Sequence, residues 1–217
     1  MHTTPMSAQI LKEPSQEDLL LIEQAGRTCY KSDSQISENS YQNFIRKIIE
    51  LGHESVIEHA HMTVKIVANR GVTHELVRHR LASFSQESTR YCNYSKDRFG
   101  QSVEFVLPGW SMDYSIPSET RNATLKVWQD SMKEAEKAYF ALLEQGLSPQ
   151  YARGVLPIDL KTEIVVTANL RQWRHIFNLR CDKAAHPDIR SICNIILKNT
   201  VVPVVFDDLK EKYLNSN

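Results

Sequence analysis

Two segments in which apolar and polar residues alternate constrain the fold of this chain most strongly. The first runs from His61 to Ala68, and the second lies within the sequence LKTEIVVTANLR at 160–171. A period of two is typical of a β-strand with one buried face. Helical patterns separate the two segments, but the regular strand–helix rhythm of a parallel, doubly wound sheet is missing. We therefore expect an α+β fold with a small antiparallel-rich sheet flanked by helices. One face of each segment carries small or apolar residues: Met62, Val64, Ile66 and Ala68 in the first, and Thr162, Ile164, Val166 and Ala168 in the second.

The rest of the chain is dominated by apolar residues at helical spacing. Ser15 followed by Asp18 is a helix-start signal, and Gly52 and Gly146 follow apolar stripes, as glycines at helix ends do. The sequence has no linker rich in Pro, Gly or Ser, so a single catalytic domain over residues 1–217 is expected. We expect helices over about 19–29, 41–51, 72–80, 118–145 and 188–198, further helices from about 149 and 171, and another strand over 103–107.

The charge balance argues against a general nucleic-acid binder. Lysine and arginine together number 26, as do aspartate and glutamate, whereas non-specific nucleic-acid binders carry a basic surplus. The four cysteines lie far apart without a C-x-x-C pair, which favours free thiols over a disulfide scaffold or a zinc knuckle. The N-terminal segment lacks the order of a signal peptide, and no apolar run approaches the length of a membrane span. A soluble, cytoplasmic protein is therefore expected.

The sequence RHRLASFSQESTRY at 78–91 concentrates groups that bind anions. It holds three arginines, a histidine and four serine or threonine hydroxyls, with Glu87 as its only acid. Guanidinium forks and hydroxyls are the groups that hold phosphate oxygens. If the helix predicted from Val72 reaches Arg80, this arginine ends an apolar stripe, where long basic side chains commonly extend to water. Two interpretations stay open: an ordinary surface arginine, or a phosphate- or nucleotide-binding site.

A second arginine-rich segment, RQWRHIFNLR at 171–180, is expected to be a helix. Trp173, Ile176 and Phe177 form its buried stripe, and Arg180 continues that stripe. A guanidinium directed inward needs a partner, because an unpaired buried charge is costly. Asp182 could supply the partner structurally, or an anionic ligand could supply it functionally. The polar face of this helix, which solvation alone would explain, carries Arg171, Arg174, His175 and Asn178.

Three other kinds of site find no support in the residue spacing. HESVIEHAH at 53–61 has Ile57 where the H-E-x-x-H pattern requires histidine, so no metal site is expected. Ser88 and His79 lack the G-x-S-x-G context that would favour a hydrolytic triad. The chain has seven glycines but no G-x-G-x-x-G, so side chains must hold any nucleotide cofactor.

The arginine-rich segments resemble the signature of the flavin-dependent thymidylate synthases, which is R-H-R followed after seven residues by Ser, here Arg78 to Ser88. GHESVIEH at 52–59, YARGVLP at 151–157 and TANLRQWRHIFNLR at 167–180 resemble further segments of that family. The resemblance implies the fold of the family and a homotetramer whose active sites are shared between subunits. It also implies conversion of dUMP to dTMP, with 5,10-methylenetetrahydrofolate as carbon donor and NADPH as reductant through FAD. Neither a nucleic acid nor a membrane is expected as a partner.

The resemblance also assigns roles to individual residues. Arg180 is the expected catalytic residue: next to the uracil ring, its charge would favour the form that has lost the N3 proton. Arg90 and Arg153, with Ser88, suit the nucleotide phosphate. The expected FAD contacts are Ser55, Arg78, His79, Arg80, Gln86, Asn169, Arg171 and His175. The expected dUMP contacts are Glu75, Arg78, Gln86, Ser88, Thr89, Arg90, Arg153 and Arg180.

The sequence departs from the family pattern at a few of these positions. Glu75 and Gln86 stand where Gln and Glu are frequent, as though the two had been exchanged. His175 occupies a place where Asn is also found, and Ser85 replaces a frequent Asn. Two alternatives to the synthase remain: a nucleotide- or RNA-binding module without catalysis, and a family member that acts on a different pyrimidine.

Overall fold

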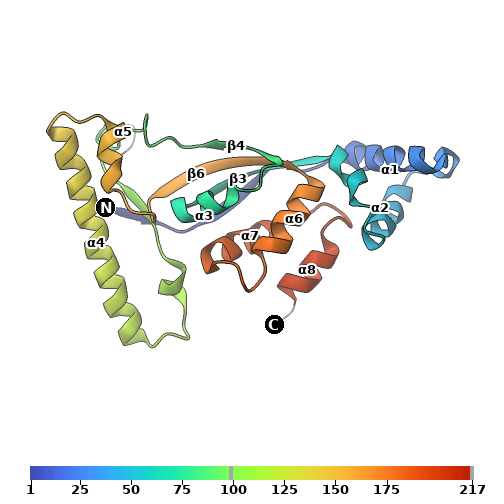
Figure 1. Cartoon of the computed structure of the whole chain (residues 1–217). Helices are drawn as coiled ribbons and strands as arrows, with labels where there is room; N and C mark the ends of the chain where they lie inside the picture. The colour runs from blue at the N-terminus through green and yellow to red at the C-terminus, as the bar shows by residue number, and fades with distance from the viewer. Residues whose placement is uncertain (98–99, 216–217) are drawn as a thin grey trace. The chain divides into compact units, whose positions relative to one another are not determined.

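The computed structural model describes residues 1–97 and 100–215, and it combines two sheets with helices (Figure 1). The larger sheet has the strand order β2-β3-β6-β4, formed by Ser7–Lys12, His61–Asn69, Lys161–Asn169 and Ala82–Gln86. Leu170 donates its backbone N–H to Ala60, and the hydroxyls of Thr63 and Thr167 lie 2.9 Å apart. Residue numbers therefore rise along β3 as they fall along β6, which is antiparallel pairing. The expected α+β fold with an antiparallel-rich sheet is confirmed.

A second, smaller sheet pairs two strands in parallel. It joins β1 (His2–Thr4) to β5 (Glu104–Val106), with His2 opposite Glu104. The chain divides into two compact units, the first comprising Met1–Ser7, Val67–Glu75 and Ser85–Ile164, and the second Ala8–Ile66, Leu76–Phe84 and Val165–Asn217. Strands β3, β4 and β6 contribute residues to both units. The expectation of a single domain over residues 1–217 stays a prediction.

The first unit is built around a long helix, α4 (Ser118–Glu144), beside which α5 (Pro149–Ala152) lies in Figure 1. The unit also contains the 3-10 helices Gly109–Met112 and Arg153–Val155 and most of α3 (Arg70–Leu76). The core of this unit consists of Tyr94, Val103, Phe105, Met132, Tyr139, Ala152 and Leu160. At its edge, the indole N–H of Trp128 donates to Asp159 at 2.8 Å.

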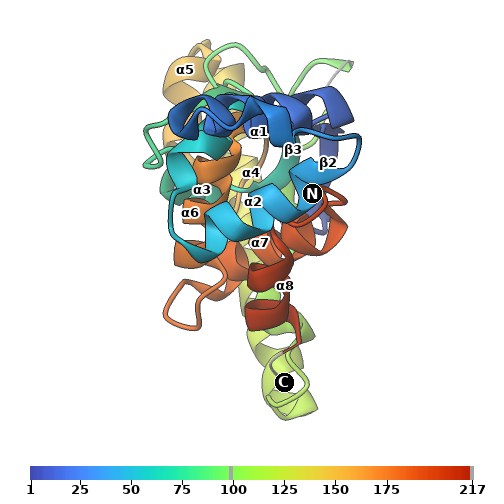
Figure 2. The same cartoon turned by 90° about the vertical axis from the view of Figure 1, so that its right-hand side faces the viewer.

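The second unit contains two groups of helices (Figure 2). In the first group, α1 (Gln16–Tyr30) packs against α2 (Ser40–Glu50) and the 3-10 helix η2 (Glu54–His59), with η1 (Asp33–Gln35) between α1 and α2 in the chain. In the second group, α6 (Leu170–Arg180), α7 (Pro187–Asn199) and α8 (Asp207–Leu214) pack together. The rings of Trp173, Phe177 and Phe206 make consecutive contacts at the centre of this group.

The alternation patterns correctly predict which residues are buried. Met62, Val64, Ile66 and Ala68 are fully buried along β3, and the corresponding face of β6 is buried as well. Ser15 and Asp18 form a reciprocal capping box at the start of α1, and Gly146 follows α4 with a positive φ of 88°. Local sequence signals therefore specify both long strands and several helix ends.

Other expectations require correction. The helix predicted over 72–80 ends at Leu76, so Val77 and Arg80 are exposed and neither belongs to a buried helical stripe. Strands β1, β2 and β4 and helix α8 were not predicted from the sequence. Among the described residues, no helix combines the length and the apolar character that a membrane span requires.

Candidate active site

The R-H-R motif lies in the short connection between α3 and β4. After α3 ends, the backbone N–H of His79 donates to the carbonyl of Leu76 at 3.0 Å, which turns the chain. Arg78 and Arg80 consequently point to solvent, whereas the side chain of His79 is 5% exposed. The histidine, and not Arg80, is therefore the buried member of the motif.

His79 contacts Arg180, the last residue of α6. The Nε of Arg180 donates to Nε2 of His79 at 3.0 Å. The ring of His175, one helical turn earlier on α6, meets the His79 ring edge to face at a centroid distance of 5.8 Å. An imidazole that accepts a hydrogen bond at Nε2 must be unprotonated there. The sequence left open whether Asp182 or a ligand would be the partner of Arg180. In the structure, the imidazole of His79 is one of its partners.

The surroundings of His79 keep its imidazole neutral. Burial, the guanidinium of Arg180 and the ring of His175 together lower the pKa of His79 from 6.5 to about 4. Each of these effects disfavours a second positive charge. At neutral pH the pair therefore consists of a charged donor, Arg180, and an uncharged acceptor.

Asn169 is the last residue of strand β6 and the N-cap of helix α6. Its Oδ1 accepts the backbone N–H of Gln172 at 2.8 Å, so Asn169 caps the helix. In the first turn, Arg171 donates to Glu58 of η2 at 2.6 Å, and both side chains remain about half exposed. The segment that holds Ser55, itself exposed, is thereby tied to the start of α6.

Arg174 corrects the interpretation of the polar face of this helix. It is 4% exposed and donates to Glu54 at 2.9 Å, to both carboxylate oxygens of Asp208 at 2.7 Å, and to the carbonyl of Val205 at 2.5 Å. Such a bidentate pair with additional hydrogen bonds compensates the burial of a guanidinium. Arg174 therefore joins η2, α6 and α8 and is not a solvated surface residue.

The predicted phosphate-binding residues gather in the first unit. Arg153 donates to the hydroxyl of Thr89 at 2.9 Å, and Thr89 is buried. The backbone N–H of Arg90 donates to the Ser88 hydroxyl at 3.3 Å, so Ser88 and Arg90 lie in one turn. A cavity of about 390 Å³ opens beside them. Its lining consists of Arg70, His74, Thr89, Arg153, Gly154, Leu156, Pro157, Ile158 and Leu160.

Arg70 also forms hydrogen bonds in this region, although the sequence did not predict it as a site residue. Its only distinguishing feature in the sequence is its position directly after an alternating strand. Arg70 donates to the carbonyl of Glu87 at 3.2 Å and to the hydroxyl of Thr162 at 3.1 Å. Gln86, at the end of β4, donates from its amide to Thr73 at 2.9 Å and to the same Thr162 hydroxyl at 3.2 Å. A glutamate at position 86 could not donate these bonds. The two threonine hydroxyls that accept them therefore suit the glutamine that stands here in place of the more frequent glutamate.

No cluster of three or more metal-ligating side chains occurs within the described residues. None of the four cysteines forms a disulfide bond, and burial raises the pKa of Cys181 to about 12, which keeps its thiol protonated.

The chain matches known proteins over most of its length. The family model described as thymidylate synthase complementing protein matches residues 11–204. Proteins named flavin-dependent thymidylate synthase from Geobacter sulfurreducens and Mycobacterium tuberculosis are each 36% identical to it, over 85% and 88% of this chain and 78% and 79% of theirs. The chain belongs to the flavin-dependent thymidylate synthase family.

The relatives and the fold agree on this assignment. The flavin-dependent thymidylate synthase of Pyrococcus furiosus is 35% identical over 79% of this chain and 67% of its own. The crystal structure of the UMP/dUMP methylase PolB from Streptomyces cacaoi, bound with 5-Br dUMP, has the same fold, with a TM-score of 0.78, 22% identity and 98% coverage of both chains.

In this flavin-dependent thymidylate synthase family member, the expected ligand contacts separate into two groups. The first unit holds Glu75, Gln86, Ser88, Thr89, Arg90 and Arg153. The second unit holds Ser55, Arg78, His79, Arg80, Asn169, Arg171, His175 and Arg180.

Proposed function

We propose that this chain is a thymidylate synthase that methylates dUMP to dTMP, with 5,10-methylenetetrahydrofolate as carbon donor, NADPH as reductant and FAD as cofactor. Membership of the family over residues 11–204 supports the reaction. The observation that carries the catalytic role is the contact of Arg180 with a neutral His79. It joins the residue expected to activate the substrate to the motif expected to hold the cofactor.

The side chains of the second unit fit FAD. Arg78 and Arg80 are exposed, and neither forms an ion pair with an acid among the described residues, so both are available to a diphosphate. Arg171, Asn169, Ser55 and the ring of His175 would supply further contacts around the same motif. When bound, FAD supplies the hydride-transfer chemistry of the reaction.

The residues of the first unit fit the nucleotide substrate. Arg153 and Arg90 would bind the phosphate of dUMP together with the hydroxyls of Ser88 and Thr89. The bond from Arg153 to the buried Thr89 holds the guanidinium in place before any ligand arrives. Glu75 and Gln86 of this unit would orient the remainder of the nucleotide, for which the family resemblance also names Arg78 of the second unit.

Arg180 would act on the pyrimidine ring. Its Nε is engaged by His79, which fixes the plane of the guanidinium. A fixed positive charge beside the uracil favours loss of the N3 proton, because a nearby cation stabilises the anion most where water is scarce. Because His79 is uncharged, it orients Arg180 without competing for that anion.

We further propose a homotetramer with active sites shared between subunits, located in the cytoplasm. Leu81 and Tyr91 directly follow the arginines expected to bind ligands, yet they are 76% and 73% exposed. In the proposed assembly, a neighbouring subunit would cover these two side chains. Four cysteines without a disulfide bond are typical of proteins in a reducing compartment.

The direct test is dTMP formation by the purified, FAD-loaded protein under anaerobic conditions, with NADPH, methylenetetrahydrofolate and either dUMP or UMP. We expect dTMP from dUMP, and we expect the Arg180→Ala variant to lose turnover while it retains FAD by absorbance. Full activity of that variant would refute the role of Arg180. Turnover of another pyrimidine in place of dUMP would favour a different substrate, and salt-sensitive RNA binding without flavin would favour the binding-module alternative.

A further inference from the structure

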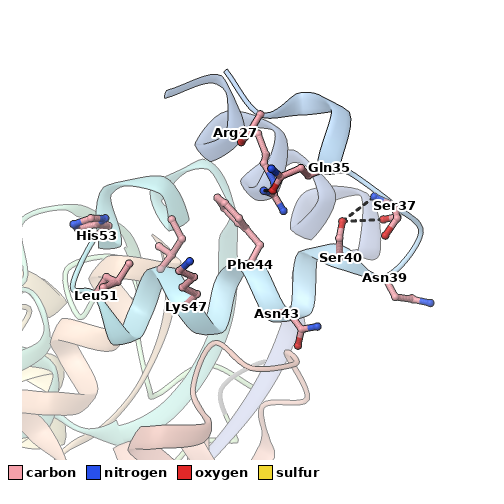
Figure 3. A pocket seen from close by; sticks show the side chains of 12 residues that line it. Arg27, Gln35, Ser37, Asn39, Ser40, Asn43, Phe44, Lys47, Leu51 and His53 are labelled. Carbon is pink, nitrogen blue, oxygen red and sulfur yellow. Dashed lines mark hydrogen bonds between the residues drawn. The ribbon is translucent and has the colours of Figure 1, made fainter. Parts of the chain in front are cut away.

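A cavity of about 820 Å³ opens between α1, η1 and α2 of the second unit (Figure 3). This volume falls within the range of small-molecule binding sites. Of the family-like segments only GHESVIEH reaches it, through His53, and none of the ligand contacts expected from the family lines it. Its lining consists of Arg27, Ser32, Gln35, Ser37, Asn39, Ser40, Asn43, Phe44, Lys47, Ile48, Leu51 and His53.

One wall of this cavity is a preformed polar network. Arg27 donates to Glu23 at 2.9 and 3.1 Å and to the amide oxygen of Gln35 at 2.6 Å. Glu23 is fully buried, and its second oxygen lies 2.6 Å from the hydroxyl of Ser40. Because helices α1 and α2 and the η1 turn all contribute to the network, the wall is fixed before a ligand binds.

An aromatic ring is held against this wall. The guanidinium of Arg27 lies 4.8 Å from the centroid of the Phe44 ring, and Gly26 packs against the ring's far edge so closely that a Cβ would overlap it. Figure 3 shows Phe44 and Lys47 rising from the same helix toward the interior of the cavity. The cavity therefore offers a flat apolar surface beside polar groups.

The cavity carries a positive charge that the protein does not neutralise. The lining residues include no carboxylate, and the charge of Arg27 is balanced by Glu23 behind it. Lys47 is exposed and has no acid partner within ion-pair distance in residues 1–97 and 100–215. A lysine in the last turn of a helix is also favourable for the helix alone, but here Lys47 lines the cavity together with Phe44.

The cavity adjoins the proposed flavin site along the chain. His53, which lines it, is the N-cap of η2 and stands two residues before Ser55. The wall of the cavity and an expected flavin contact therefore belong to one continuous segment of the chain.

We propose that this cavity binds a co-substrate that joins a flat ring to an anionic tail, with Phe44 against the ring and Lys47 beside the carboxylate or phosphate oxygens. The inference rests on the proposed function, whose two co-substrates share this chemistry: methylenetetrahydrofolate ends in glutamyl carboxylates, and NADPH carries phosphates. The amide of Gln35 suits either tail, because its nitrogen can donate to an anionic oxygen while its own oxygen accepts from Arg27.

The test compares Lys47→Gln with Lys198→Gln, which removes the same charge from the last turn of α7 and lies outside the lining of the cavity. Both variants are loaded with FAD, and the Kd is measured by titration calorimetry for NADP⁺, NAD⁺, and mono- and triglutamyl methylenetetrahydrofolate. The oxidised dinucleotides keep the phosphates of NADPH and NADH but cannot reduce the flavin. Loss of a charge-assisted bond predicts a roughly tenfold weaker Kd for one co-substrate in Lys47→Gln and little change in Lys198→Gln.

The ligand series identifies the source of the anion. A loss confined to NADP⁺, with NAD⁺ unchanged, assigns Lys47 to the 2′-phosphate, and a loss of the preference for triglutamyl folate assigns it to the glutamyl tail. Unchanged affinities for all four ligands, or equal losses in both variants, overturn the proposal. Because binding is measured without turnover, the result stands apart from dTMP formation by the wild-type protein, which tests the proposed function.

Discussion

Acidification should destabilise the protein through His79. In the folded protein the pKa of His79 is lowered from 6.5 to about 4 by burial, by Arg180 and by His175, the two charged or titratable residues of α6 that face it. The unfolded chain therefore binds a proton at this histidine between pH 6.5 and 4, where the folded protein does not. Stability is fully present above the unfolded value and is lost as the pH falls through this window.

The size of the effect follows from the two pKa values. At pH 5, values of 6.5 and about 4 correspond to about 2 kcal/mol relative to neutral pH. Relaxation of the surrounding groups around a protonated imidazole offsets part of this cost, so we expect about 1 kcal/mol. Replacement by glutamine removes the titration while it leaves an oxygen that can accept the bond from Arg180.

The measurement is urea unfolding of the cofactor-free protein at pH 7 and pH 5. We expect His79→Gln to lose about 1 kcal/mol less than the wild type between the two pH values. His61→Gln, at an exposed position of β3, serves as the control and should lose as much as the wild type. If His79→Gln loses as much stability on acidification as the wild type, the imidazole is not the group that titrates, and its neutral pairing with Arg180 is wrong.

Two further substitutions test the remaining contacts of the site. Arg174→Met leaves Glu54 and Asp208 without their partner and should lower the free energy of unfolding by about 3 kcal/mol. The control, Arg171→Met, breaks an exposed ion pair and should cost less than about 1 kcal/mol. Equal losses of the two variants in urea unfolding would contradict the assigned burial of Arg174. Thr89→Val removes the acceptor of Arg153 and should weaken dUMP binding roughly tenfold by calorimetry. The control, Thr124→Val on α4, should leave dUMP binding unchanged. An unchanged Kd of Thr89→Val for dUMP would argue against Arg153 as a phosphate ligand.

The sequence predicted those parts of the fold that depend on neighbouring residues. The alternation in β3 and β6 identified their buried faces, because side chains on a strand point to opposite sides in turn. The capping box joins Ser15 to Asp18, so its signal likewise lies within a few neighbouring residues. Strand β4 was missed because its sequence, ASFSQ, is rich in serine, and its alternation runs over only five residues.

The corrections within the site concern contacts between distant segments. Arg174 lies on the polar side of α6 by periodicity, and only Asp208, from a helix that the sequence did not reveal, explains its burial. The contact of His79 with FAD stays a prediction, and its bond to Arg180 spans 101 residues and has no local signal. The family resemblance named the candidate residues, whereas the contacts among them required the structure.

Because Gly26 packs closely against Phe44, the absence of a side chain at position 26 allows the Phe44 ring to keep its position beside the cavity. A methyl group at position 26 would displace the ring into the cavity and fill part of it, without any change in charge. Positions 26 and 44 are therefore expected to vary together in evolution, a larger residue at one requiring a smaller one at the other. The same coupling offers a steric means of narrowing this cavity in an engineered enzyme while every polar group of its wall is retained.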